Sequence, residues 1–143
     1  MEPTTATDVL GGVEVLHKKI TNQMDLIDLG RMGVPKYALM SLTKYLNLSI
    51  KQIAELLSVT ERTIQRYPLE KHFNRTISEQ ILHIAQVVAK GTRIFGDREN
   101  FLSWVKHPNK AFANNIPMNL FSSRFGTEMI SDELGRIEHG VFS

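Results

Sequence analysis

Apolar residues recur at spacings of three and four along most of the chain, which is the period of helices that bury one face. The longest such run extends from Ile77 to Phe95, and shorter runs lie within 35–47, 50–57 and 98–105. Outside the first twenty residues there is no convincing alternation of the kind that predicts a strand. The pattern therefore predicts an all-α protein.

Polar residues and glycines mark the expected ends of these helices. Ser49 precedes Gln52 by three residues, and Thr76 precedes Glu79 by three, so both pairs have the spacing of an N-terminal capping box. Gly96 is predicted to end the long helix in the left-handed conformation. A further helix is expected after Gly96, and a polar loop is expected after that helix. The remaining boundary signals are Asp97, Pro108, the loop residues 109–115, Pro117, and Gly126-Thr127 just before the terminal helix.

The first twenty residues are predicted to form an N-terminal arm that is partly disordered. Residues 1–7 are small and polar, as chain ends without order commonly are. Residues 9–20 contain Gly11-Gly12 and a short apolar alternation at Val13 and Val15, which fits either a strand or a helix. These two alternatives stay open.

Residues 50–67 have the small and apolar positions of a helix-turn-helix, in the right order and over the right length. Ala54 is small where two helices cross closely, Ser58 takes a turn position that is usually glycine, and Thr60 is a candidate N-cap. Ile64 would hold the second helix against the first. The plainer alternative is an αα-hairpin whose second helix is merely solvated.

The outward face of the second helix carries side chains that are suited to DNA. Arginine pairs bidentately with guanine and glutamine with adenine, whereas hydroxyl groups reach phosphates. Residues 50–67 hold three cations and two carboxylates, a net charge of only +1, so one copy would bind weakly and a homodimer is expected. The candidate DNA-binding residues are Thr60, Glu61, Arg62, Thr63, Gln65 and Arg66.

The end of the chain combines an apolar helical stripe with features that an ordinary helix does not need. Gly135 lies inside the stripe, where glycine costs about 1 kcal/mol relative to alanine and usually allows another backbone to approach. With the charged residues beside it, this glycine predicts a plug for a partner's cleft. The alternative is a terminal helix that packs on its own domain and frays. The stripe is Ile130, Leu134, Ile137 and Val141, and the candidate partner-binding residues are Gly135, Arg136, Glu138, His139, Gly140, Val141, Phe142 and Ser143.

Composition narrows the class of protein. Hydrophobic residues make up 42% of the 143 residues, enough for a core, and the formal net charge of +2 is compatible with nucleic-acid binding. The absence of cysteine excludes disulfides, cysteine-ligated zinc and a cysteine nucleophile. No signal-peptide pattern is visible, and no apolar segment approaches the roughly 18 residues of a membrane helix, so a cytoplasmic protein is expected.

An enzyme is the main alternative from another class. The five histidines show no metal-ligand spacing, and the sequence has no GxGxxG, P-loop or G-x-S-x-G motif. His83 lies on an otherwise apolar helix and is interpreted as a residue at the core boundary rather than a base. Glu138 and His139 are adjacent and therefore do not face each other on a helix. No catalytic residue, metal site or cofactor is predicted.

Three stretches of the sequence resemble the Xre/MbcA/ParS family of antitoxins, in particular the Xre antitoxins of RES–Xre type II toxin–antitoxin systems. Together they span roughly residues 45–143. The C-terminal part is the specific one, because many repressor families share the helix-turn-helix. The stretches are the helix-turn-helix ending in 61–66, the run 88–109, and 116–121 with Gly126 and the closing 134–142.

The resemblance implies a non-enzymatic protein with two roles. Residues 21–75 would form an Xre/Cro-like helix-turn-helix domain that binds operator DNA as an autorepressor. Residues 76–143 would form a small helical toxin-binding domain, in which the candidate partner-binding residues occlude the active site of a RES-domain, NAD-consuming toxin from the same operon. Residues 1–20 are the N-terminal arm. The alternative is a helix-turn-helix transcriptional regulator without a toxin partner.

Overall fold

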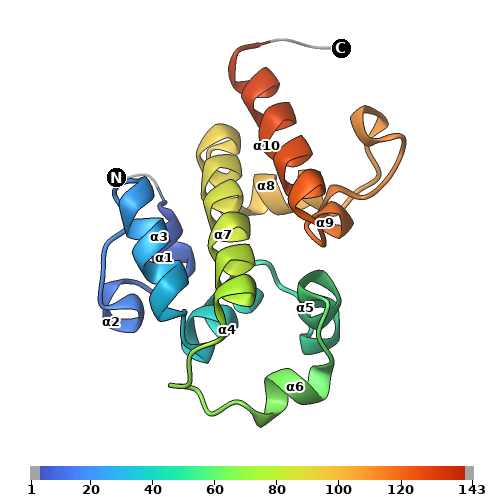
Figure 1. The fold of residues 1–143 in the computed structure, drawn as a ribbon. Helices are drawn as coiled ribbons and strands as arrows, with labels where there is room; N and C mark the ends of the chain where they lie inside the picture. Colours follow the sequence, from blue (N-terminus) through green and yellow to red (C-terminus); the bar gives the residue numbers. More distant parts are fainter. Residues whose placement is uncertain (1–3, 141–143) are drawn as a thin grey trace.

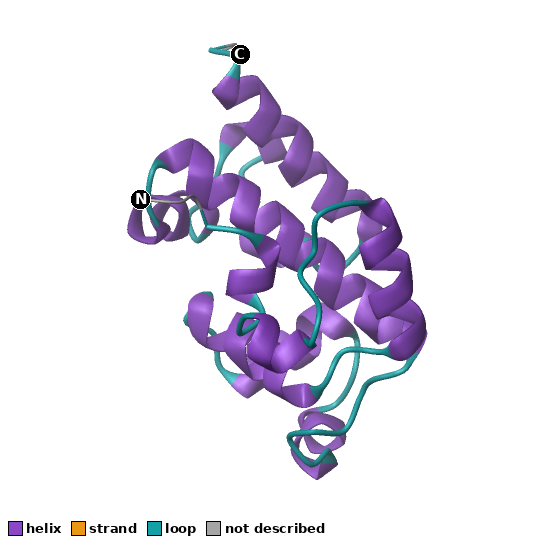
Figure 2. Ribbon diagram, turned by 90° about the vertical axis from the view of Figure 1, so that its left-hand side faces the viewer, coloured by secondary structure: helices purple, strands orange, loops and turns teal. Residues whose placement is uncertain are grey.

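Helices make up the regular structure of the chain, as a computed structural model of residues 4–140 shows (Figures 1 and 2). Within these residues, extended pairing is limited to the isolated bridges Pro35–His72 and Asn109–Asn115. The predicted all-α class is confirmed. The α-helices are α1 (Ala6–Val9), α2 (Val13–Leu16), α3 (Gln23–Met32), α4 (Lys36–Tyr45), α5 (Ile50–Leu57), α6 (Glu61–Arg66), α7 (Arg75–Phe95), α8 (Arg98–Val105), α9 (Pro117–Leu120) and α10 (Arg124–Glu138), and a 3-10 helix spans Lys110–Phe112.

Helix α7 is the centre of the fold. In Figure 1 it runs between α1 and α3 on one side and α10 on the other, and it contacts all three. Because it is covered on both sides, its buried positions include neighbours such as Ile81 and Leu82, and Val87 and Val88. Near its C-terminal end, Gly91 makes room for α8, since a Cβ there would lie 2.2 Å from Cε1 of Phe101.

The first helices belong to the core. Val9, Leu10 and Leu16 are buried, and the side chain of Thr5 forms a capping box with Asp8 at the start of α1. The expectation of a partly disordered arm is therefore wrong for residues 4–20, and the open choice between strand and helix is decided as two short helices. Helices α1 and α2 are only four residues long each, which is too short for the spacing of apolar residues to predict their burial. Residues 1–3 lie outside the described residues.

The ends of the central helices agree with the sequence signals at three positions and differ at a fourth. Ser49 forms its predicted box with Gln52, Gly96 ends α7 at φ +89°, and Asp97 caps α8. The box predicted at Thr76 and Glu79 is wrong. Helix α7 starts two residues earlier than predicted, at Arg75, with Asn74 as its N-cap.

Tertiary contacts explain why Asn74 is the cap. Phe73 is buried, and its carbonyl accepts a hydrogen bond of 3.2 Å from the Ser78 hydroxyl, whose oxygen accepts one of 2.9 Å from the amide of Val34. These contacts place the chain so that Asn74 Oδ1 accepts from the Ile77 amide at 2.9 Å. Thr76 is left inside the first turn.

The C-terminal third differs from its prediction in two places. Ser123, rather than Gly126-Thr127, marks the start of the terminal helix, because its hydroxyl accepts from the Gly126 amide at 2.9 Å. Gly126 lies inside α10, where a Cβ would be 2.0 Å from the Leu120 carbonyl oxygen. The expected polar loop 109–115 contains the 3-10 turn, whose buried Phe112 packs edge-on against Trp104 at a ring distance of 6.0 Å.

Replacing each of the two candidate N-caps of α7 by alanine tests which of them caps the helix. Asn74→Ala should lower the free energy of unfolding by about 1 kcal/mol, because one amide of the first turn loses its partner. Thr76→Ala is the matched control and should leave stability within about 0.5 kcal/mol, since Thr76 is exposed and makes no cap. Urea unfolding followed by circular dichroism measures both. Equal losses for the two variants would contradict the assignment.

Candidate functional site

Helices α5 and α6 form the predicted helix-turn-helix. Ala54 is buried at the crossing, and its carbonyl accepts a 3.0 Å hydrogen bond from the Val59 amide. Ser58 adopts the left-handed conformation, with φ 55° and ψ 40°, that glycine usually takes in this turn. Thr60 caps α6 by accepting from the Thr63 amide at 3.1 Å, and Ile64 is fully buried against the rest of the domain. The motif is confirmed.

The far end of α6 is fixed by an aromatic contact. Tyr67 stacks on Phe73 with ring centroids 4.6 Å apart, and its carbonyl accepts a 3.0 Å hydrogen bond from Nζ of Lys36 in α4. Lys71 lies over the Tyr67 ring at 4.8 Å. Tyr67 therefore ties the helix-turn-helix to the start of α7.

The candidate DNA-binding side chains share one exposed surface on α6, with a single exception. Thr63 is half-buried, and its hydroxyl pairs with the Thr60 hydroxyl at 2.9 Å. Arg62 and Arg66 form no ion pair with any of residues 4–140, so their guanidinium groups are available. The exposed members are Thr60, Glu61, Arg62, Gln65 and Arg66.

The second candidate surface is at the other end of the molecule, where α10 extends beyond the end of α7 (Figure 1). Ile130 and Leu134 are fully buried, and Lys90 of α7 donates hydrogen bonds to the carbonyl and hydroxyl oxygens of Ser131 at 3.0 and 3.2 Å. Ile137 is only half-buried. Helix α10 is thus held firmly in its middle, while its last turn projects.

The predicted partner-binding residues lie on this projecting turn. Arg136, Glu138, His139 and Gly140 are exposed, and Arg136 Nη1 lies 3.8 Å from Oε2 of Glu133. The structure therefore brings the charged members of the predicted set together at one helix end. Val141, Phe142 and Ser143 lie outside the described residues.

Gly135 differs from the other two glycines inside helices α7 and α10. A Cβ at Gly91 or Gly126 would overlap the protein's own atoms at 2.2 or 2.0 Å. At Gly135 the nearest atom would be Lys90 Nζ at 3.7 Å, an ordinary contact. Residues 4–140 therefore give no steric reason for glycine at position 135. A partner whose backbone approaches the helix closely at this point would supply one.

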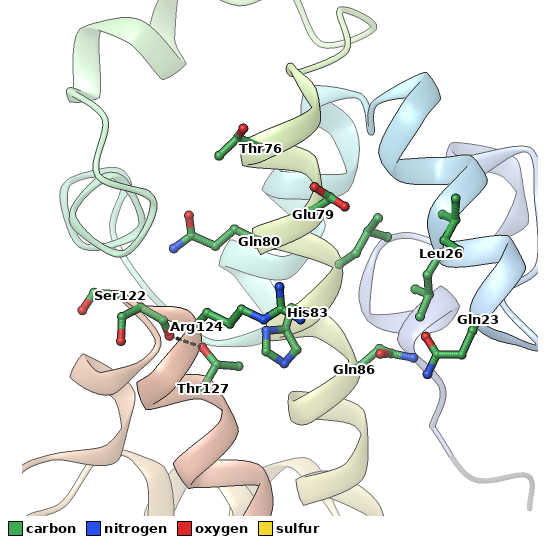
Figure 3. Close-up of a pocket in the computed structure, with 13 residues that line it drawn as sticks. Gln23, Leu26, Thr76, Glu79, Gln80, His83, Gln86, Ser122, Arg124 and Thr127 are labelled. Atoms are coloured by element: carbon green, nitrogen blue, oxygen red, sulfur yellow. Dashed lines mark hydrogen bonds between the residues drawn. The ribbon is translucent and has the colours of Figure 1, made fainter.

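A groove of about 530 Å³ that was not predicted from the sequence lies between α3, α7 and α10 (Figure 3). Gln80, His83 and Gln86 point into it from α7, facing Gln23 of α3 and Arg124 of α10. Burial, and secondarily the charge of Arg124, lower the pKa of His83, which is therefore neutral at neutral pH. Its half-buried place agrees with the boundary position predicted for it.

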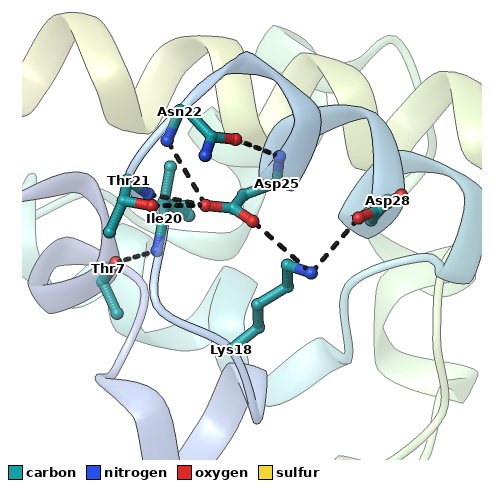
Figure 4. A network of polar contacts seen from close by, with 7 residues as sticks. All are labelled: Thr7, Lys18, Ile20, Thr21, Asn22, Asp25 and Asp28. Atoms are coloured by element: carbon teal, nitrogen blue, oxygen red, sulfur yellow. Dashed lines mark hydrogen bonds and ion pairs between the residues drawn. The ribbon is translucent and has the colours of Figure 1, made fainter.

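A polar network fixes the α3 wall of this groove (Figure 4). Nζ of Lys18 lies 3.4 Å from Asp25 Oδ1 and 3.2 Å from Asp28 Oδ2. The other oxygen of Asp25 accepts hydrogen bonds from the amide and hydroxyl of Thr21 at 2.9 and 2.8 Å, and these bonds are the main reason that its pKa is lowered. The network holds the segment before α3 against its first turn.

No three His, Asp or Glu side chains among residues 4–140 lie close enough together to hold a metal ion. None of the helices described there is both long enough and apolar enough to cross a membrane. The candidate functional features are the exposed face of α6 and the projecting end of α10.

Two family models match the two halves of the chain. Residues 25–86 match the antitoxin Xre-like helix-turn-helix domain. Residues 90–140 match the antitoxin Xre/MbcA/ParS C-terminal toxin-binding domain. The two matched ranges meet inside α7, so this helix is shared by both.

Individual proteins agree with the family models. The antitoxin Xre of Yersinia enterocolitica is 26% identical over 120 residues, which cover 82% of this chain and 81% of the relative. A chain in the crystal structure of the M. tuberculosis MbcT–MbcA toxin–antitoxin complex has a similar fold, with a TM-score of 0.52 and 14% identity over 86% of this chain and 100% of that one. The chain belongs to the Xre/MbcA/ParS family of antitoxins, with an Xre-like helix-turn-helix domain followed by a toxin-binding domain.

Proposed function

We propose that this antitoxin neutralises a RES-domain, NAD-consuming toxin from its own operon by covering the toxin's active site with the end of α10, and that it represses the operon through α6. In this proposal residues 21–75 bind DNA and residues 76–143 bind the toxin, in the cytoplasm. The observation that carries it is Gly135, in a projecting charged turn of the toxin-binding domain. This glycine lies inside a helix, and among residues 4–140 a Cβ there would meet only Lys90 Nζ, at 3.7 Å. The match over 90–140 also disfavours a regulator without a toxin partner.

The charges of the projecting turn suit a dinucleotide-binding cleft. A cleft that holds the phosphates of NAD presents basic groups, and Glu138 would lie against them. Arg136 would pair with an acidic residue of the toxin, exchanging its long contact with Glu133 for a stronger one. His139 and the tip from Gly140 to Ser143 would complete the cover.

The DNA-binding role rests on the exposed face of α6. Arg62, Gln65 and Arg66 would read base edges, while Thr60 and its neighbours would contact phosphates. One helix-turn-helix with a net charge of +1 neutralises few phosphates, so two copies related by a two-fold axis would bind half-sites about one helical turn apart.

Arginine substitutions test operator binding. Arg62→Ala or Arg66→Ala should weaken binding to the promoter of the operon by roughly 1–3 kcal/mol if the side chain reads a base, and should reduce the salt dependence if it touches phosphate. Fluorescence anisotropy over a salt series gives both quantities. Lys110→Ala removes an equal, exposed charge from the 3-10 helix, outside the helix-turn-helix, and is the control.

Two outcomes would contradict the DNA proposal. One is unchanged promoter binding by the double variant of Arg62 and Arg66. The other concerns the dimer: light scattering of the complex should give a mass with two 16.3 kDa chains, and one chain per operator would exclude the two-fold arrangement.

Truncation tests the toxin-binding end. Deleting residues 136–143 should abolish rescue of toxin-expressing cells, while operator binding and helix content stay nearly unchanged, because the buried anchors Ile130 and Leu134 are retained. Growth assays, anisotropy and circular dichroism measure the three properties. Rescue by the truncated protein would place the inhibitory surface elsewhere, and loss of helix content would make the tail structural.

Substituting Gly135 separates folding from toxin binding. Gly135→Ala should raise the free energy of unfolding of the free antitoxin by up to about 1 kcal/mol, since alanine favours the helix and its Cβ meets no close atom. The same change should weaken toxin binding in isothermal calorimetry. Gly126→Ala is the matched control and should destabilise the protein, because its Cβ meets the Leu120 carbonyl. A stabilised Gly135→Ala variant with unchanged toxin affinity would show that no partner approaches here.

A further inference from the structure

Helix α10 exposes two large apolar side chains. Phe125 is 83% exposed and Met129 is 48% exposed, and they are the only large apolar side chains within residues 90–140 with this degree of exposure. They are four residues apart and therefore adjoin on one side of the helix. The opposite side of the same helix is buried through Ile130 and Leu134. The fold leaves Phe125 and Met129 uncovered although it buries their neighbours.

The apolar pair begins a row that runs along the outer side of α10. At 1.5 Å per residue the row is about 16 Å long, and its spacing of four, three and four residues keeps it on one helical face. The C-terminal end of this row is the projecting turn to which we assign toxin contact. The row consists of the exposed residues Phe125, Met129, Asp132 and Arg136.

Charged side chains flank the apolar pair. Arg124 Nε lies 3.3 Å from Oε1 of Glu128, and this exposed ion pair borders Phe125 on one side. Protein-binding patches commonly have this arrangement, with an aromatic anchor inside a polar rim. Because Phe125 and Met129 adjoin, they form a contiguous apolar patch, and such a patch with polar residues at its rim is typical of a contact site.

We propose that Phe125 and Met129 anchor the toxin, so that the outer face of α10 lies in an apolar groove of the toxin from Phe125 to Arg136. The inference rests on the proposed function and extends it from the helix end to the whole helix. The toxin is the occupant because both residues lie in the range matched to the toxin-binding domain and on the same row as Arg136. The toxin is thus held by a hydrophobic anchor that is separate from the charged cover of its active site.

Matched substitutions of exposed side chains test the anchor. With the purified RES-type toxin of the operon, Phe125→Ala should raise the Kd of the full-length antitoxin at least about tenfold, and Met129→Ala severalfold. Met32→Ala is the control, because Met32 is 58% exposed but lies on α3. All three side chains are exposed, so thermal unfolding should be unchanged. Biolayer interferometry gives the affinities, and light scattering gives the mass of the free antitoxin.

The outcomes separate this inference from the proposed function. Wild-type binding with an unchanged Kd for both Phe125→Ala and Met129→Ala overturns the anchor alone. A loss of antitoxin self-association with unchanged toxin affinity also overturns it, since the patch would then join two copies of this chain. A wild-type protein that does not bind the RES-type toxin overturns both proposals.

Discussion

The packing of α7 on two sides is the constraint on which the rest of the structure depends. A helix with one buried stripe can be displaced from its neighbours, but α7 is enclosed by α1 and α3 on one side and α10 on the other. Its start is held by Ser78, which bonds to Val34 and Phe73, and its end by the fit of Phe101 against Gly91. Any shift of α7 would break contacts on both sides at once.

This central helix sets the separation of the two functional surfaces. Its 21 residues span about 30 Å, with α6 tied near its start through Tyr67 and Phe73 and α10 tied along its second half through Lys90 and Ser131. Helices α6 and α10 therefore belong to one rigid framework, although the candidate residues on them do not overlap. In the proposed function, one chain can hold an operator and a toxin without the two partners competing for space.

Helix α10 has two kinds of exposed surface, one apolar and one charged, which would bind a partner through different interactions. Its exposed apolar pair near the N-terminal end suits burial, which ionic screening does not weaken, whereas its projecting charged turn suits complementary charges, which set orientation. Both rely on the same buried anchors, Ile130 and Leu134, to present them. In the proposed function, affinity and active-site cover would come from separate parts of one helix.

The sequence by itself determined the all-α class, the helix-turn-helix and the exposed side of α6, because these follow from local spacing and capping chemistry. Ala54, Thr60 and Ile64 lie within eleven residues of one another, so the pattern contains the whole motif. The charged end of α10 was predicted for the same reason, through Gly135 and its neighbours.

Tertiary structure alone decided which of several equivalent local signals is used. Asn74 caps α7 instead of Thr76 because burial of Phe73 places the preceding chain, and Gly126 is needed inside α10 because the Leu120 carbonyl approaches it. The spacing of apolar residues likewise places Phe125 on a helix. It does not reveal that this residue lies on the exposed face, since that depends on which neighbours cover the helix. Local chemistry sets what each segment can form, whereas contacts between distant segments decide where it ends and which face it shows.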